Sequence, residues 1–128
     1  MAKNWTAPQI AKHKVSDGNE PLVMLTAYDA PGGRMVSEAG ADIILVGDTL
    51  AMVVLGYEDT MQVTIEDMVH HTAAVARAEP DAFIVADLPW MSYHVSQEET
   101  VKNAARLIRA GAKAVKLEGG QDLSLIHI

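Results

Sequence analysis

Three carboxylic acids in this sequence stand at the end of short, strongly apolar runs. Asp87 and Glu118 directly follow such a run, and Asp48 comes two residues after another. If the runs are neighbouring parallel strands, their carboxyl ends meet at one edge of the sheet, where α/β folds bind ligands. Carboxylates gathered there repel one another unless a cation lies between them. The pattern therefore predicts a cation site built from oxygen ligands.

Mg²⁺ is the cation that suits this donor set, because the ligands are oxygens and the chain has no cysteine. Mg²⁺ keeps open positions, so it can chelate a 2-oxo acid and stabilise an enolate. Lys116 lies two residues before Glu118, on the same side of a strand, where its ammonium can neutralise a substrate carboxylate. The alternative is that each acid is only a turn residue or a helix cap. Three acids after successive runs favour a functional role.

Four apolar runs are the strands that must position these acids. The second and third runs are apolar at nearly every position, which indicates burial on both faces, as in a parallel sheet covered by helices. The alternation of runs with helical segments predicts an α/β fold. The runs are Leu22–Thr26, Ile43–Val46, Ala82–Ala86 and Ala112–Leu117.

Helix signals fill the segments between the runs. Thr64 and Ser96 each begin the pattern of a helix N-cap, and Gly40 and Gly111 stand where helices should end. Similar sequences surround the two glycines, which is typical of ordinary αβ connections or of a repeated barrel unit. Helices are predicted over 8–13 and 31–39, from residue 65 and from residue 97, the last burying Val101, Ala104 and Ile108.

Composition excludes several classes of function. Ten Lys and Arg against 17 Asp and Glu give a net charge of −7, which disfavours a nucleic-acid partner. The absence of cysteine excludes disulfides and thiolate metal sites. The longest strongly apolar run, Leu50–Leu55, is too short to span a bilayer, and the N-terminus lacks a secretory signal. We therefore expect a cytoplasmic protein with neither nucleic-acid nor membrane partners.

The length of 128 residues suits one domain, but a complete (β/α)₈ barrel needs about 250 residues. Four strands of a barrel leave two open sheet edges, so the chain is expected to be either a small open-sheet protein or a fragment. Residues 123–128 have the sequence that the end of a sequencing adaptor encodes when read in frame. We predict that residues 1–122 are the N-terminal half of a single barrel domain and that 123–128 are a non-native tail.

The sequence from Leu22 to Gly120 resembles the ketopantoate hydroxymethyltransferase family. Six motifs occur in the order and spacing of that family, which makes the resemblance specific. The motifs are Thr26–Asp29, Val46–Asp48, Val63–Thr64, His71–Val75, Ala86–Pro89 and Val115–Gly120.

The resemblance implies a (β/α)₈ TIM barrel, of which this chain holds the first four β/α units. It implies transfer of a hydroxymethyl group from the co-substrate 5,10-methylenetetrahydrofolate to 3-methyl-2-oxobutanoate, giving 2-dehydropantoate. In the family, the acids that correspond to Asp48, Asp87 and Glu118 surround Mg²⁺. Lys116, Asp48, Asp87 and Thr49 are the corresponding keto-acid ligands. The partners so implied are a small 2-oxo acid and a folate.

Two departures from the family pattern bear on activity. Thr49 replaces the usual serine, which keeps the hydroxyl and adds a methyl group. The glutamate that serves the family as general base belongs to the second half of the barrel, beyond the end of this chain. We therefore expect the chain alone to be inactive and poorly folded. The resemblance implies that its full-length parent is an active homo-oligomer.

Three other functions remain open from the sequence. Another Mg²⁺-dependent enzyme of 2-oxo acids, such as a class II aldolase or a lyase of the phosphoenolpyruvate type, would share the metal and the enolate but not the folate. A non-catalytic open-sheet binding module would be complete at this length. An interaction subunit would assemble with a separate half-barrel.

Overall fold

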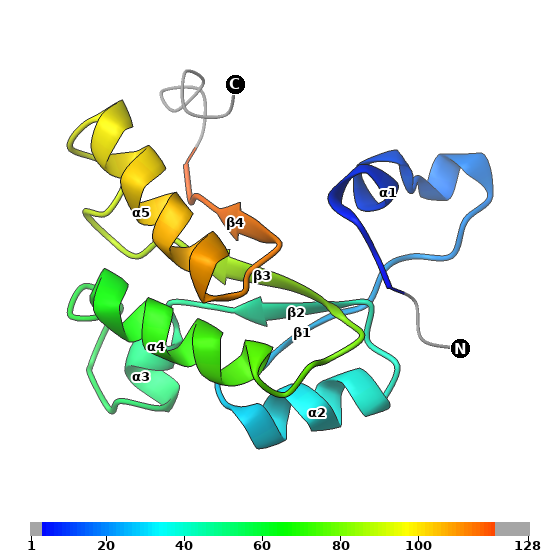
Figure 1. Cartoon of the computed structure of the whole chain (residues 1–128), viewed down its shortest axis with the longest axis horizontal. Helices are drawn as coiled ribbons and strands as arrows, with labels where there is room; N and C mark the ends of the chain where they lie inside the picture. The colour runs from blue at the N-terminus through cyan, green and yellow to red at the C-terminus, as the bar shows by residue number, and fades with distance from the viewer. Residues whose placement is uncertain (1–3, 120–128) are drawn as a thin grey trace.

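The computed structural model describes residues 4–119 and shows a four-stranded parallel sheet (Figure 1). The strands pair in chain order, β1-β2-β3-β4, as expected for consecutive β/α units. β4 is shorter than predicted because the amide of Ala112 closes the preceding helix by donating to Leu107 O. The strands are β1 Met24–Thr26, β2 Ile43–Val46, β3 Phe83–Asp87 and β4 Ala114–Lys116.

Helices occupy the segments predicted for them, and every predicted helix end lies within one residue of the observed end. Thr64 and Ser96 are N-caps, and their side-chain oxygens accept hydrogen bonds from the amides of Asp67 and Glu99. Two short helices, α3 and η1, were not predicted, because a single turn carries no periodic apolar pattern. The helices are α1 Ala7–Lys12, η1 Val15–Asp17, α2 Ala30–Glu38, α3 Leu50–Val53, α4 Ile65–Ala76 and α5 Gln97–Ala110.

Both faces of the central strands are buried, as the continuous apolar runs predict. Ile44 and Ile84 belong to the main core on the side of α2, α4 and α5. Ile43 and Phe83 face the other way, into a second cluster that includes Ile10 of α1. The alternation follows from the two-residue period of a strand. In Figure 1, α1 stands apart from the other helices.

The buried face of α5 differs from the prediction. Val101 and Ile108 are 68% and 47% exposed, whereas Thr100, Asn103 and Leu107 are buried. The predicted face was wrong because a polar side chain can be buried at little cost once it is hydrogen-bonded. Thr100 Oγ1 donates to Ser96 O, and Asn103 Nδ2 donates to Ser92 O. Apolar spacing alone does not reveal such partners.

β1 forms an exposed apolar edge of the sheet. Its residues Met24 and Leu25 are each 46% exposed, and within residues 4–119 the strand pairs with β2 alone. An unpaired apolar edge is a template for association with another chain. In the same described range, no helix is long and apolar enough to cross a membrane.

The exposed edge predicts that Leu25→Lys reduces self-association of the chain, because a charge on an edge strand opposes edge-to-edge pairing. Sedimentation velocity over a range of protein concentrations measures the effect. Val101→Lys is the matched control, since it adds the same charge at an exposed residue of α5. An equal reduction by both variants would show that net charge, rather than the edge, controls association.

Candidate functional site

The predicted site residues lie together at the carboxyl end of the sheet. Asp87 is the last residue of β3 and stands opposite Lys116, the last residue of β4. Asp48 follows β2 by two residues, and Glu118 follows β4 by two. Because the strands are parallel and in register, three chain segments bring these groups to one edge. Thr49, next to Asp48, is exposed at the start of α3, and its side chain makes no capping hydrogen bond there.

Asp87 is the centre of the contacts. Its side chain is 7% exposed, and its Oδ2 accepts a hydrogen bond of 3.1 Å from the amide of Asp48. Lys116 Nζ lies 2.9 Å from Asp87 Oδ1 and 3.8 Å from Glu118 Oε2. The ammonium therefore stands between two carboxylates.

The site carries three carboxylates against one ammonium. Burial raises the pKa of Asp48, and the negative charges of Asp87 and Glu118 raise it further. Burial works against the charge of Lys116, but the ion pair with Asp87 and the other two carboxylates outweigh it, so the pKa of Lys116 is raised. The neighbouring carboxylates contribute to both shifts, and their negative charge favours the binding of a cation.

This electrostatic strain predicts that Asp48→Asn stabilises the chain at neutral pH when no divalent cation is present. A carboxyl whose pKa is raised on folding contributes stability below its ordinary value of 3.8 and loses it as the pH rises through the raised value. Asparagine does not ionise and does not incur that loss. Thermal melts with a chelator should show the largest difference between variant and parent at neutral pH. A difference that stays constant as the pH is lowered would contradict the prediction.

The donor set fits a hard divalent cation in its chemistry. All of its side-chain donor atoms are oxygens. Asp87 Oδ1 is buried and accepts no well-aligned hydrogen bond among the described residues, and the ammonium of Lys116 lies 2.9 Å from it. The three carboxylates do not form a ready-made cage: across residues 4–119, no three acidic, histidine or cysteine side chains are grouped closely enough to hold a metal ion. The side chain of Glu118 is 80% exposed, so it is the acid with the most freedom to move.

Two contacts near the site were not anticipated from the sequence. The hydroxyl of Tyr93, in the loop after β3, donates to Glu118 O at 2.9 Å, and Tyr93 is buried. His71 Nδ1 of α4 lies 2.7 Å from Tyr28 O, in the loop after β1. Both are contacts to backbone oxygens distant in the chain, and no local pattern signals them.

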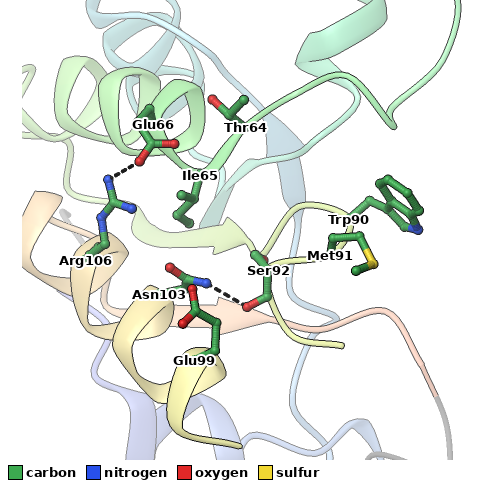
Figure 2. Close-up of a pocket in the computed structure, with 9 residues that line it drawn as sticks. All are labelled: Thr64, Ile65, Glu66, Trp90, Met91, Ser92, Glu99, Asn103 and Arg106. Carbon is green, nitrogen blue, oxygen red and sulfur yellow. Dashed lines mark hydrogen bonds and ion pairs between the residues drawn. The ribbon is translucent and has the colours of Figure 1, made fainter. Parts of the chain in front are cut away.

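A separate pocket of about 340 Å³ opens between α4, α5 and the loop after β3 (Figure 2). Arg106 and Glu66 form an ion pair on its wall. The hydrogen bond from Arg106 lowers the pKa of Glu66. Trp90 stands at its rim and is 51% exposed. None of the five predicted site residues lines this pocket, so the carboxylate site and the pocket are distinct.

Solved structures of other proteins share the arrangement of strands and helices. Phosphoenolpyruvate phosphomutase from Streptomyces platensis subsp. rosaceus superposes with a TM-score of 0.69 at 20% identity, over 88% of this chain and 38% of that one. The 2,3-dimethylmalate lyase of the PEP mutase/isocitrate lyase superfamily gives 0.67 at 20% identity, over 93% and 42%. Both are matched over part of their length only, and both likenesses show the fold: consecutive β/α units of a TIM barrel.

Sequence comparison is more specific. The enzyme called 3-methyl-2-oxobutanoate hydroxymethyltransferase in Ignicoccus hospitalis is 63% identical over 105 residues, which are 82% of this chain and 40% of the relative. That of Bacillus subtilis is 56% identical over 84% of this chain and 39% of the relative. The chain thus spans about 40% of the length of these relatives. The sequence model of ketopantoate hydroxymethyltransferase matches residues 4–128. With the acids and the lysine of its motifs at one end of the sheet, this chain belongs to the ketopantoate hydroxymethyltransferase family.

Proposed function

We propose that this chain supplies the metal-binding and keto-acid-binding end of a hydroxymethyltransferase of pantothenate biosynthesis. The reaction transfers the methylene carbon of 5,10-methylenetetrahydrofolate to 3-methyl-2-oxobutanoate as a hydroxymethyl group, with the hydroxyl oxygen supplied by water, and gives 2-dehydropantoate and tetrahydrofolate. The observation that carries the proposal is the contact of Asp87 with both the Asp48 amide and Lys116, which joins three strand ends into one site. The identity of 53–63% with relatives named for this activity supports the choice of reaction.

Each residue has a distinct role in this proposal. Asp48, Asp87 and Glu118 would hold Mg²⁺, with Glu118 turning inward from its exposed position. When bound, Mg²⁺ supplies a Lewis acid that polarises the keto oxygen and acidifies the neighbouring C–H. Lys116 would orient the substrate by pairing with its carboxylate, and its raised pKa keeps it charged for that purpose.

Thr49 and the proton transfer complete the proposal. The exposed hydroxyl of Thr49, beside Asp48, would donate a hydrogen bond to the keto acid. No described residue is assigned as the general base, a role that the family resemblance gives to a glutamate of the second half of the barrel. A homo-oligomeric full-length parent is part of the same proposal.

A chimera tests the proposed function. It consists of residues 1–119 of this chain followed by the remaining part of the Ignicoccus hospitalis relative, joined where the alignment of the two allows. The chimera is expected to restore growth without pantothenate to a bacterium that lacks the enzyme, and to form 2-dehydropantoate in vitro. Lys116→Ala should abolish both, whereas Lys113→Ala, a surface control three residues away, should abolish neither. Product formation from free aldehyde without the folate would instead favour an aldolase.

A further inference from the structure

Tyr93 connects the loop after β3 with the segment that carries Glu118. This β3–α5 loop comprises residues 88–96. The Tyr93 ring is 6% exposed and belongs to the main core, while its hydroxyl donates to the backbone oxygen of Glu118 at 2.9 Å. The hydroxyl thus fixes the backbone of one proposed metal ligand from a neighbouring element.

The loop itself is held rigidly, so it can serve as an anchor. The amide and the hydroxyl of Ser92 both donate to Pro89 O, at 3.1 and 2.6 Å. The side chain of Asn103 on α5 donates to Ser92 O at 2.8 Å (Figure 2). Ser92 and Asn103 are both buried, where such hydrogen bonds are stronger and more rigid than in water. The position of Tyr93 is therefore fixed by both the core and α5.

Glu118 needs an anchor more than the other two acids do. Asp87 is buried at the end of a strand and is held by the Asp48 amide. Glu118 lies beyond the end of β4, its side chain is 80% exposed, and its carboxylate is 3.8 Å from Lys116. An exposed ion pair at that distance contributes little to fixing a side chain. The hydrogen bond from the buried Tyr93 to its backbone oxygen is thus the contact that holds this residue.

We propose that Tyr93 is a positioning residue: it holds the backbone of Glu118 at the place from which the carboxylate can turn toward Asp48 and Asp87. The inference rests on the proposed function insofar as Glu118 is taken as a metal ligand. Groups that orient metal ligands from outside the coordination shell typically change metal affinity about 10–100-fold when they are removed. Tyr93→Phe deletes the hydroxyl and keeps the ring in the core.

The control is Thr100→Val. Thr100 is 2% exposed, and its hydroxyl also donates to a backbone oxygen, that of Ser96, at 2.8 Å. The two variants each lose a partly buried hydrogen bond from a side-chain hydroxyl to a backbone oxygen, but only Tyr93 reaches Glu118. Mn²⁺ serves as the probe, with its affinity for both the chimera and the chain measured by electron paramagnetic resonance and isothermal titration. Backbone order parameters of residues 117–119 are measured by NMR in both proteins without metal.

Tyr93→Phe is expected to weaken Mn²⁺ binding by about 10-fold and to lower the order parameters at Glu118 and Gly119. Thr100→Val should leave both within about twofold of the parent, even where it lowers the melting temperature. Unchanged order parameters at Glu118 in Tyr93→Phe would overturn the positioning role, whether or not the metal binds. If the order parameters fall but neither the parent chimera nor the parent chain binds Mn²⁺, the anchor stands as a backbone contact, and the proposed metal site, with the role given to Tyr93 in it, is overturned.

Discussion

Replacing Asp87 by asparagine is expected to weaken Mg²⁺ and Mn²⁺ binding at least about 100-fold, the upper end of the effect seen when only an outer-shell partner of a metal site is lost. Asp87 is the only one of the three acids that is both buried and in contact with two other site segments. Asparagine keeps the shape and can still accept the hydrogen bond from the Asp48 amide, but it removes the charge. In the chimera, the same substitution should abolish measurable formation of 2-dehydropantoate. Titration calorimetry and Mn²⁺ resonance measure the binding.

Glu66→Gln is the matched control for Asp87→Asn. Glu66 also pairs with a basic side chain, Arg106 at 2.8 Å, but it lies on the wall of the separate pocket. The control removes one negative charge from the chain and should leave metal affinity within about twofold, because exposed ion pairs are worth little. If Asp87→Asn and Glu66→Gln reduced binding equally, the metal would be attracted by net charge alone. The strand-end site would then be wrong.

Replacing Gly111 by alanine is expected to destabilise the fold by about 2–5 kcal/mol, through backbone strain and steric overlap together. Gly111 ends α5 with φ of 119°, in the left-handed region that L side chains disfavour. A Cβ at this position would also overlap the Cβ of Ala76, the last residue of α4. Equilibrium urea unfolding followed by circular dichroism, in the chain and in the chimera, measures the loss of stability.

Gly40→Ala separates the two causes. Gly40 ends α2 with φ of 89°, and a Cβ there meets no atom within 4 Å. It should therefore cost only the strain of the backbone, about 1–2 kcal/mol. Adding Ala76→Gly to Gly111→Ala should recover the part of the lost stability that is due to steric overlap. The recovery appears as a coupling energy in a double-mutant cycle. Equal costs for Gly40→Ala and Gly111→Ala would show that the close approach of α4 and α5 is unimportant.

The two glycines also explain the repeated sequence pattern around them. After each one, the next amide donates to the carbonyl five residues earlier: Ala41 to Val36 and Ala112 to Leu107. This is the Schellman ending of a helix, which requires glycine at the same place. Both units use the same stop and then begin a strand. The glycine at each helix end could be predicted, because a positive φ is a local requirement. The contact of Gly111 with α4 could not be predicted, because it depends on how two helices pack.

The sequence alone determined the order of strands and helices and the end of the sheet at which Asp48, Asp87 and Lys116 would meet. Continuous apolar runs and helix caps are local signals, and parallel pairing then aligns every strand end on one edge. Only the tertiary structure decided which face of α5 is buried and which residue anchors Glu118. Asn103 and Tyr93 are buried with side-chain hydrogen bonds to backbone oxygens of other segments, those of Ser92 and Glu118. Such partners are set by the packing of whole elements, and no spacing in the chain encodes them.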